Sequence, residues 1–280
     1  MGTTPAPSDC LVVVTGASNG IGLEIALEAA RDGHPVLLVA RGQTALDSAA
    51  AAVSAAGAPF AFVLAADLAT QEGVDAVAAR VEELDLPIAA LVNNAGFGAW
   101  GPFAEQSTER LASMIDLNDR AVVLLTRMLL DRIMQGCGGI LTVASIAAFQ
   151  PGPGMVVYHA SKAFALSFSV GLREELRGTG VRATALCPGP VATGFATAAG
   201  NADLDDMLRT RISAVPADKV ARMAWNGLKR NEAVVVPGAV NRLGALGAKI
   251  APLTLATRMA RTALGAIDRH GRSTLPQPQD

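Results

Sequence analysis

Residues 10–22, CLVVVTGASNGIG, decide the fold, because they join an apolar run, a glycine-rich turn and the start of a helix. The run 10–15 is rich in β-branched residues and has no polar alternation, which is typical of a strand buried on both faces of a parallel sheet. Gly16, Gly20 and Gly22 follow with the spacing TGxxxGxG. Glycines between a strand and a helix permit a tight turn and the close approach of a pyrophosphate to the helix N-terminus. The stretch therefore predicts a dinucleotide-binding unit, with a plain glycine-rich turn as the alternative.

The rest of the chain repeats this alternation of apolar runs and helical periodicity. It predicts a doubly wound parallel α/β sheet, the Rossmann fold, in one domain at residues 9–237. A helical extension is expected at 238–270 and a disordered tail at 271–280. Ligands of such sheets lie at the carboxyl ends of the strands. Further strands are expected at 34–40, 59–65, 88–92, 139–144, 181–186 and 233–236, and helices at 21–32, 45–56, 70–84, 107–135 and 157–178.

Composition excludes several classes of protein. The 280 residues carry a net charge of −2, which gives no sign of nucleic-acid binding. Alanine-rich runs account for much of the 51% hydrophobic content, and the longest uncharged stretch contains Gly57 and Pro59, so no membrane span is expected. The N-terminus lacks the features of a signal peptide. Cys10, Cys137 and Cys187 have no metal-ligand spacing, so we expect no metal site and a reduced, cytoplasmic setting.

A second informative stretch is residues 145–162, SIAAFQPGPGMVVYHASK, which contains the only tyrosine of the chain, Tyr158. Lys162 follows it at i+4 and is expected on the same helix face. An ammonium near a phenol favours the phenolate, so the pair predicts a Tyr158 pKa below its usual value and a proton donor or acceptor for a carbonyl or alcohol oxygen. A chance pair on an amphipathic helix is the alternative. His159 is expected to be exposed, because neighbouring helix residues face different ways.

The residue after the second strand bears on cofactor choice. In dinucleotide-binding folds an acid at this position bonds the ribose 2′-hydroxyl of NAD, whereas an arginine suits the 2′-phosphate of NADP. Ala40 and Arg41 offer no acid and one cation. We therefore expect NADP(H), with NAD(H) as the second choice and a solvated arginine as the structural alternative.

Taken together, these motifs resemble those of the short-chain dehydrogenase/reductase family over roughly residues 9–237. The matching features are TGxxxGxG, an aspartate after the third strand, NNAG, an asparagine in the following helix, the serine, YxxxK and a Pro-Gly turn, carried by Gly16, Gly20, Gly22, Asp67, residues 93–96, Asn118, Ser145, Tyr158, Lys162, Pro188 and Gly189. The resemblance implies an oxidoreductase that transfers a hydride between a nicotinamide cofactor and a ketone or secondary alcohol.

The resemblance also implies roles for individual residues. Tyr158 would be the general acid or base, Lys162 would lower its pKa and hold the nicotinamide ribose, Ser145 would bind the substrate oxygen, and Asn118 would hold a water of a proton relay. The cofactor would be bound by Gly16, Ser18, Asn19, Gly20, Ile21, Gly22, Arg41, Asp67, Leu68, Asn94, Ala95, Gly96, Tyr158, Lys162, Pro188, Gly189, Val191 and Thr193. Asn94 is expected near the adenosine ribose, Asp67 and Leu68 near the adenine, and Val191 and Thr193 at the carboxamide. Relatives usually pair through the helices at 107–135 and 157–178, so a homodimer or homotetramer is expected.

The substrate is less well specified. Segments 97–103, 147–157 and 195–211 are expected to line an apolar pocket, the last as a lid; alternatively, their aromatic residues pack the loops themselves. Leu243, Leu246 and Ile250 form a helical stripe in a basic C-terminal segment, which predicts a cap or subunit contact, or else a membrane-surface helix. A 3-oxoacyl thioester reductase is the alternative enzyme. A non-catalytic nucleotide sensor or scaffold is the alternative of another class.

Overall fold

A computed structural model of the chain describes residues 6–191, 215–250, 254 and 257. Its centre is a seven-stranded parallel sheet with the strand order β3-β2-β1-β4-β5-β6-β7. β1 lies in the middle of the sheet, and β2 and β3 extend it on one side. The chain then crosses over, and β4 to β7 extend the sheet on the other side. The doubly wound sheet and all seven expected strands are confirmed. The strands are Leu11–Thr15, Val36–Ala40, Ala61–Ala65, Ile88–Asn93, Gly139–Val143, Arg182–Leu186 and Val234–Val235.

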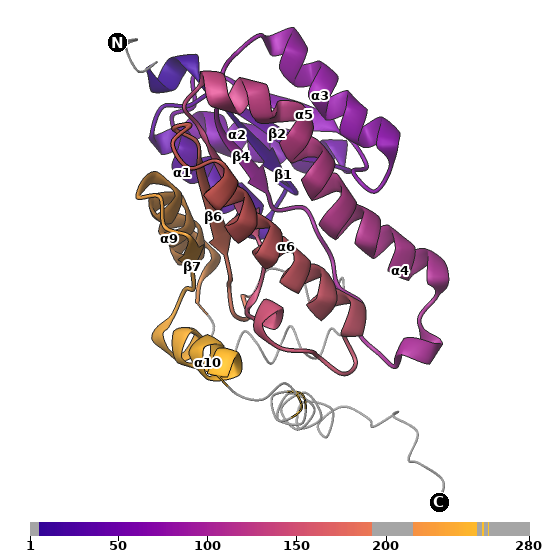
Figure 1. The fold of residues 1–280 in the computed structure, drawn as a ribbon. Helices are drawn as coiled ribbons and strands as arrows, with labels where there is room; N and C mark the ends of the chain where they lie inside the picture. The colour runs from indigo at the N-terminus through magenta and orange to yellow at the C-terminus, as the bar shows by residue number, and fades with distance from the viewer. Residues whose placement is uncertain (1–5, 192–214, 251–253, 255–256, 258–280) are drawn as a thin grey trace, which may run out of the picture.

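Helices cover both faces of the sheet. One apolar cluster joins Val12 and Val14 of β1 to α1, α2 and α9, whereas a second joins Leu11 and Val13 to α3 and α5. This alternation explains why β1 is fully buried and has no polar positions. Figure 1 shows α5 and α6 side by side over one face. The helices are α1 Gly20–Arg31, α2 Gln43–Ala55, α3 Gln71–Leu84, α4 Thr108–Ile115, α5 Ala121–Gln135, α6 Val156–Glu175, α9 Ala217–Lys229 and α10 Ala239–Ile250.

The expected helix at 107–135 differs from the prediction at its centre. It consists of α4, one π turn at Asp116–Arg120, and α5. A π turn accommodates one surplus residue inside a helix and occurs frequently at functional sites. Here it contains Asn118, whose side chain is buried. The register of α4 and α5 therefore changes at the residue that the sequence marks as functional.

The C-terminal helix α10 lies below α9 and β7 in the view of Figure 1. Its outer side carries the expected apolar stripe, with Leu243 and Leu246 exposed by 73% and 55%. On its inner side Asn241 is buried against the turn after β6, since a Cβ on Gly189 would lie 2.4 Å from its Nδ2. The expected second helix of the extension, apart from Thr254 and Thr257, lies outside the described residues. Among the helices in the described ranges, none has the length and apolar character of a bilayer-spanning segment.

Candidate active site

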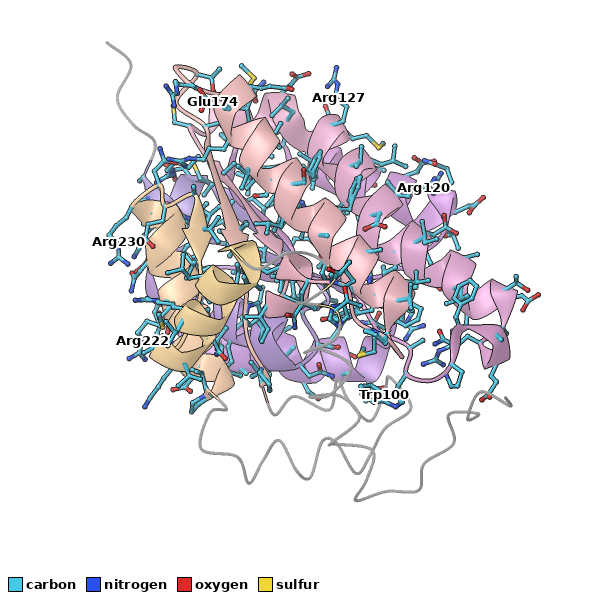
Figure 2. All side chains as sticks on the ribbon, turned by 60° about the horizontal axis from the view of Figure 1, so that its bottom comes forward. Trp100, Arg120, Arg127, Glu174, Arg222 and Arg230 are labelled. Atoms are coloured by element: carbon cyan, nitrogen blue, oxygen red, sulfur yellow. The ribbon has the colours of Figure 1, made fainter. Side chains whose placement is uncertain are left out.

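Parallel strands end at one edge of the sheet, and the candidate residues follow four of these strand ends. They are Gly16 after β1, Asn94 after β4, Ser145 after β5 and Pro188 after β6. The N-terminal end of α6, with Tyr158, lies at the same edge. Glu174 lies near the C-terminal end of α6. Figure 2 shows the loop residue Trp100 at the opposite end of the molecule from Glu174. The sheet therefore gathers the predicted site residues at one edge, as expected for this topology.

The glycine turn between β1 and α1 is closely packed. Gly16 and Gly20 have φ angles of 63° and 57°, in the left-handed region that favours glycine. Gly22 has no such φ, but a Cβ there would lie 2.4 Å from the Gly16 carbonyl oxygen and 2.4 Å from Asn94 Nδ2. Gly22 is thus required for space and the other two for backbone conformation.

Asn94 fastens this turn to the neighbouring strand end. Its Nδ2 donates to the carbonyl oxygens of Thr15 at 2.8 Å and Gly16 at 3.0 Å. Thr15 Oγ1 in turn accepts from the main-chain N–H groups of Asn94 and Ala95 and donates to Val92. The Asn94 amide is therefore occupied in shaping the glycine turn. Thr15 is the first residue of the TGxxxGxG motif, but the sequence analysis gave it no role of its own.

The N-terminus of α1 fits the phosphates of a dinucleotide. Asn19 is its N-cap but makes no side-chain capping bond, and the first turn contains no acid. The first N–H groups of a helix have no intrahelical acceptor and attract anions. Ser18, Gly20 and Ile21 lie in or beside this turn, each partly exposed. The residues present thus fit a pyrophosphate at the position that the motif predicts.

The expected adenosine end of the site lies at the ends of β2 and β3. Arg41 follows β2, is exposed, and forms no ion pair with any residue in the described ranges. Asp67 follows β3, and its Oδ1 accepts from Ala69 N at 3.1 Å. Leu68 beside it is buried. Arg41 and the Asp67–Leu68 pair therefore lie at the ends of two neighbouring strands, β2 and β3.

Ser145 and Tyr158 form the centre of the predicted chemistry. Their hydroxyl groups are hydrogen-bonded to each other, and the Tyr158 ring packs beside Phe97 and Val157. Burial raises the Tyr158 pKa to about 12, and the Ser145 hydrogen bond opposes that rise. The expected Tyr158 pKa below its usual value is therefore wrong as a net result, because desolvation of the phenolate dominates. With a pKa of about 12, Tyr158 carries its proton at neutral pH.

Lys162 lies beneath the tyrosine ring. Its Nζ donates to the Val143 carbonyl at 2.8 Å and lies 5.8 Å from the centre of the Tyr158 ring. Burial lowers the Lys162 pKa to about 8, although Asp119 opposes the shift. A Cβ on Gly96 would come within 3.4 Å of Nζ, so the NNAG segment borders the lysine. The helix spacing thus places both side chains on one face, as predicted.

Asn118 connects three parts of the site. Its Oδ1 accepts from Phe97 N at 3.1 Å, and its Nδ2 donates to Phe97 O at 3.0 Å and Ser161 Oγ at 3.0 Å. These bonds hold the loop after β4 against α6. Because both polar atoms of its side chain are occupied, its main observed role is to join the π turn, the loop after β4 and α6. The proton relay expected at Asn118 stays a prediction.

The turn after β6 completes the edge. Pro188 is buried, and its carbonyl oxygen accepts from Ile146 N at 2.9 Å, which joins this turn to the Ser145 segment. Gly189 contacts α10, and Val191 is buried. Thr193 and the expected lid at 195–211 lie outside the described residues. Pro188 is therefore placed beside the Ser145 segment, and the positions of Gly189 and Val191 at the nicotinamide stay predictions.

The structure corrects the prediction for His159. Only 7% of this residue is exposed, and its Nδ1 lies 2.7 Å from the Gln150 carbonyl oxygen. Sequence spacing shows only that His159 cannot share the face of Tyr158. It does not show that the chain after Ser145 turns back over the histidine.

The aromatic residues expected in the pocket have different surroundings. Phe97 packs beside Tyr158 against a cluster of Ala99, Leu111 and Met114. Phe103 is 60% exposed, so it is not part of that cluster. A buried apolar cluster from the loop after β4 and from α4 therefore lies beside Tyr158, with Phe97 and Val157 partly exposed over it. In the described residues no group of His, Cys, Asp or Glu is arranged to hold a metal ion.

Asp119 is a partly buried acid that the sequence reasoning missed. Its Oδ1 has no hydrogen-bond partner in the described part of the chain, and burial raises its pKa to about 6 despite the Lys162 charge. The pKa of Asp119 is higher in the folded protein than in the unfolded chain. Its contribution to the free energy of unfolding is therefore complete below about pH 4 and is lost as pH rises through 6.

Replacement of Asp119 by asparagine is expected to stabilise the protein at pH 8 by about 1 kcal/mol, which raises Tm by about 2–4 °C. No gain is expected at pH 4, where the carboxyl group is already protonated. Thermal unfolding at both pH values measures the effect, with the exposed Asp131→Asn as matched control. Equal Tm changes at pH 4 and pH 8 would show that the Asp119 charge is not responsible.

Comparisons with known proteins agree with this geometry. The family described as "short chain dehydrogenase" matches residues 10–203. Among curated proteins, the chain is 36% identical over 182 residues to the "Ketoacyl reductase HetN" of Nostoc sp., covering 65% of this chain and 63% of that protein. It is 36% identical over 223 residues to the "1-deoxy-11-beta-hydroxypentalenate dehydrogenase" of Streptomyces exfoliatus, covering 77% of this chain and 78% of that protein.

A solved structure extends the similarity over nearly the whole chain. A short-chain dehydrogenase from Sphingobium yanoikuyae, in complex with NADPH, superposes with a TM-score of 0.76 and 31% identity, covering 97% of this chain and 99% of that one. The glycine turn, the serine and the Tyr-Lys pair occupy one edge of the same kind of sheet. The chain therefore belongs to the short-chain dehydrogenase family of oxidoreductases.

Proposed function

We propose that the protein transfers a hydride between NADP(H) and an apolar ketone or secondary alcohol, with Tyr158 as general acid and base. The observation that carries the proposal is the hydrogen bond between the Ser145 and Tyr158 hydroxyl groups at the dinucleotide-binding edge of the sheet. Two hydroxyl groups held together can both reach one substrate oxygen. Such donors stabilise the negative charge that develops there in the transition state.

The reduction assigns one task to each group. When bound, the nicotinamide supplies the hydride that the carbonyl carbon accepts. Ser145 donates a hydrogen bond to the carbonyl oxygen and orients it, and Tyr158 transfers its proton to that oxygen as the charge develops. The product is the alcohol, and Tyr158 is left as a phenolate that must be reprotonated. Lys162, with its ammonium near the tyrosine ring, stabilises this phenolate. Oxidation of an alcohol uses the same steps in reverse.

Arg41 supports the choice of NADP(H). It is an exposed cation with no partner carboxylate in the described ranges, and it lies directly after β2. An arginine at this position can bind the ribose 2′-phosphate with two charged hydrogen bonds. The similar dehydrogenase from Sphingobium yanoikuyae was solved in complex with NADPH, which is in line with this choice.

Replacement of Arg41 by aspartate is expected to weaken NADPH binding about 10- to 100-fold, because it removes a charged hydrogen bond and adds a repulsive charge. NADH affinity is expected to change less than about threefold or to improve. Titration of each cofactor gives the two dissociation constants. Arg127→Asp on α5, also exposed and well separated from the site, is the control. Equal weakening of NADPH and NADH would remove the basis for preferring NADP(H).

The substrate class follows from the surface around Tyr158. Ala99, Leu111, Met114 and Phe97 form an apolar cluster that packs beside the tyrosine ring. Ala99, Leu111 and Met114 are buried, so a substrate whose carbonyl reaches Ser145 and Tyr158 would place a substituent against the partly exposed Phe97 and Val157 that cover them. Burial of apolar area there favours alkyl and aryl ketones over small polar carbonyl compounds.

A panel assay tests the proposed function. NADPH and NADH oxidation are followed with alkyl ketones, aryl ketones and a 3-oxoacyl thioester. We expect the highest kcat/KM with NADPH and an apolar ketone. The 3-oxoacyl thioester represents the alternative function, which the 36% identity to a ketoacyl reductase favours. Tight cofactor binding without turnover of any substrate would instead support the sensor or scaffold. The intact set of Ser145, Tyr158 and Lys162 argues against that outcome, because a sensor does not need a positioned acid.

We also propose that the protein pairs with a second copy through α5 and α6. The two helices lie on one face and carry exposed apolar side chains, including Met128 at 43% and Phe164 at 41%. Phe164 and Phe168 stack with ring centres 6.0 Å apart. An apolar patch of this kind on a helical face is typical of a subunit contact.

A further inference from the structure

His159 is a buried imidazole next to the catalytic tyrosine, and the mechanism above does not use it. Its Nδ1 lies 2.7 Å from the Gln150 carbonyl oxygen. A carbonyl oxygen only accepts, so Nδ1 carries a proton and donates it. The Ala147 carbonyl also faces the ring, and the two carbonyls partly oppose the lowering of the His159 pKa that burial causes. The ring therefore holds the short helix Ile146–Phe149 and the residue that follows it.

Gly152 makes room for this imidazole. A Cβ added to Gly152 would lie 2.1 Å from His159 Nε2 and 2.3 Å from Cδ2. Real Cβ atoms do not approach other atoms this closely. Gly152 is not among the glycines with positive φ, so space and not backbone conformation requires it. The glycine and the histidine thus form a matched pair across the loop.

The same loop begins at Ser145. The Ser145 Oγ accepts from Ala147 N at 3.1 Å and is hydrogen-bonded to the Tyr158 hydroxyl. Helix α6 therefore binds the loop through two successive residues: Tyr158 contacts Ser145, and His159 contacts Gln150. Loss of the His159 contact would leave the loop joined to α6 by the Ser145–Tyr158 bond, which the substrate must share.

We propose that His159 is a positioning residue that fixes the loop 145–152 on α6, so that Ser145 and Tyr158 present their hydroxyl groups to one substrate oxygen. The inference deepens the proposed function and rests on it. His159 does not touch substrate or cofactor in this proposal. It acts through the main chain of Ala147 and Gln150, with Gly152 providing the space.

The test separates positioning from general stability. His159→Ala is expected to lower kcat for ketone reduction about tenfold, because displacement of a catalytic group by a fraction of an ångström slows the chemical step. The dissociation constant of NADPH should change less than about twofold, since the glycine turn is not involved. His159→Asn, whose amide can replace the Nδ1–H donor, should recover most of the lost kcat. A kcat of His159→Ala equal to the native value, or equal losses in both variants, would overturn the proposal.

Gly152→Ala provides an independent test of the same contact. In the native background it should lower kcat about as much as His159→Ala, because its methyl group displaces the imidazole. Combined with His159→Ala it should add little, since the clash no longer exists. Gly171→Ala, on α6 with no atom within 4 Å of the added Cβ, is the control. If the fold-losses in kcat of Gly152→Ala and His159→Ala multiply in the double variant, the two residues act independently. That result would contradict the proposed contact between Gly152 and His159.

Hydrogen exchange distinguishes failure of this inference from failure of the proposed function. The Ala147 amide, bonded to Ser145 Oγ, should exchange at least about tenfold faster in His159→Ala, whereas the amides of β5 should not change. This measurement needs no substrate. If the native protein reduces no ketone but Ala147 exchange accelerates, the proposed function fails and the anchoring of the loop stands. Unchanged exchange at Ala147 overturns the anchoring, whatever the activity.

Discussion

Tyr158→Phe is expected to lower kcat for ketone reduction about 1,000-fold while NADPH affinity stays within about threefold. The change removes one oxygen atom and keeps the ring that packs beside Phe97 and Val157. The lost oxygen is the acid of the proposed reaction, and positioned acids contribute about 10²- to 10⁴-fold. No second tyrosine can replace it, because the chain has one. NADPH consumption gives kcat, and titration of the cofactor gives its dissociation constant.

The phenylalanine variant should unfold within about 2 °C of the native protein, so a loss of activity cannot be attributed to loss of structure. Val156→Ala, at a half-exposed position two residues earlier on α6, is the matched control and should keep native kcat. A Tyr158→Phe kcat within tenfold of the native value would exclude Tyr158 as the acid. Proton transfer from water or from another side chain would then have to be considered.

Gly22→Ala is expected to weaken NADPH binding at least about 100-fold and to lower Tm. The added Cβ would lie 2.4 Å from the Gly16 carbonyl oxygen and 2.4 Å from Asn94 Nδ2. The first of these is main chain, so α1 must move away from the turn that the phosphates are expected to occupy. Overpacking of this kind costs about 1–3 kcal/mol of stability, which corresponds to a Tm lower by about 2–12 °C.

The cofactor measurement is made well below the Tm of the variant, so that only folded protein is titrated. Gly171→Ala is the control, since its added Cβ meets no atom within 4 Å and alanine is favoured over glycine inside a helix. It should bind NADPH normally and should not lower Tm. Native NADPH affinity in Gly22→Ala would show that the cofactor does not use this turn.

The sheet could be predicted from the sequence because each strand is recognisable on its own. The run at 10–15 has no polar alternation, and the structure buries it between two apolar clusters. The glycine spacing, the NNAG segment and the Tyr-Lys pair could be placed at one edge because parallel strands share their direction. These inferences need only local periodicity and the topology of the fold.

Interactions that depend on side-chain geometry could not be predicted in this way. The sequence indicates that Lys162 is close to Tyr158, yet burial raises the tyrosine pKa to about 12. His159 was expected to be exposed, but the loop with Gly152 turns back over it. The contact of Asn94 with the ribose stays a prediction, and the sequence did not indicate that its Nδ2 bonds the carbonyls of Thr15 and Gly16. In each case desolvation or a main-chain partner distant in sequence decides the outcome.

The π turn at 116–120 limits where insertions and deletions can occur in relatives of this protein. Insertions and deletions usually accumulate in surface loops, because helices transmit a change of one residue as a rotation of about 100° along their axis. Here the helix itself contains one extra residue, in the π turn of Asn118. The Asn118 side-chain amide donates to both Phe97 and Ser161. Removal of that residue would turn the asparagine away from both partners. Relatives that share this asparagine should therefore keep the spacing between it and the flanking helices α4 and α5, even where the surrounding loops differ in length.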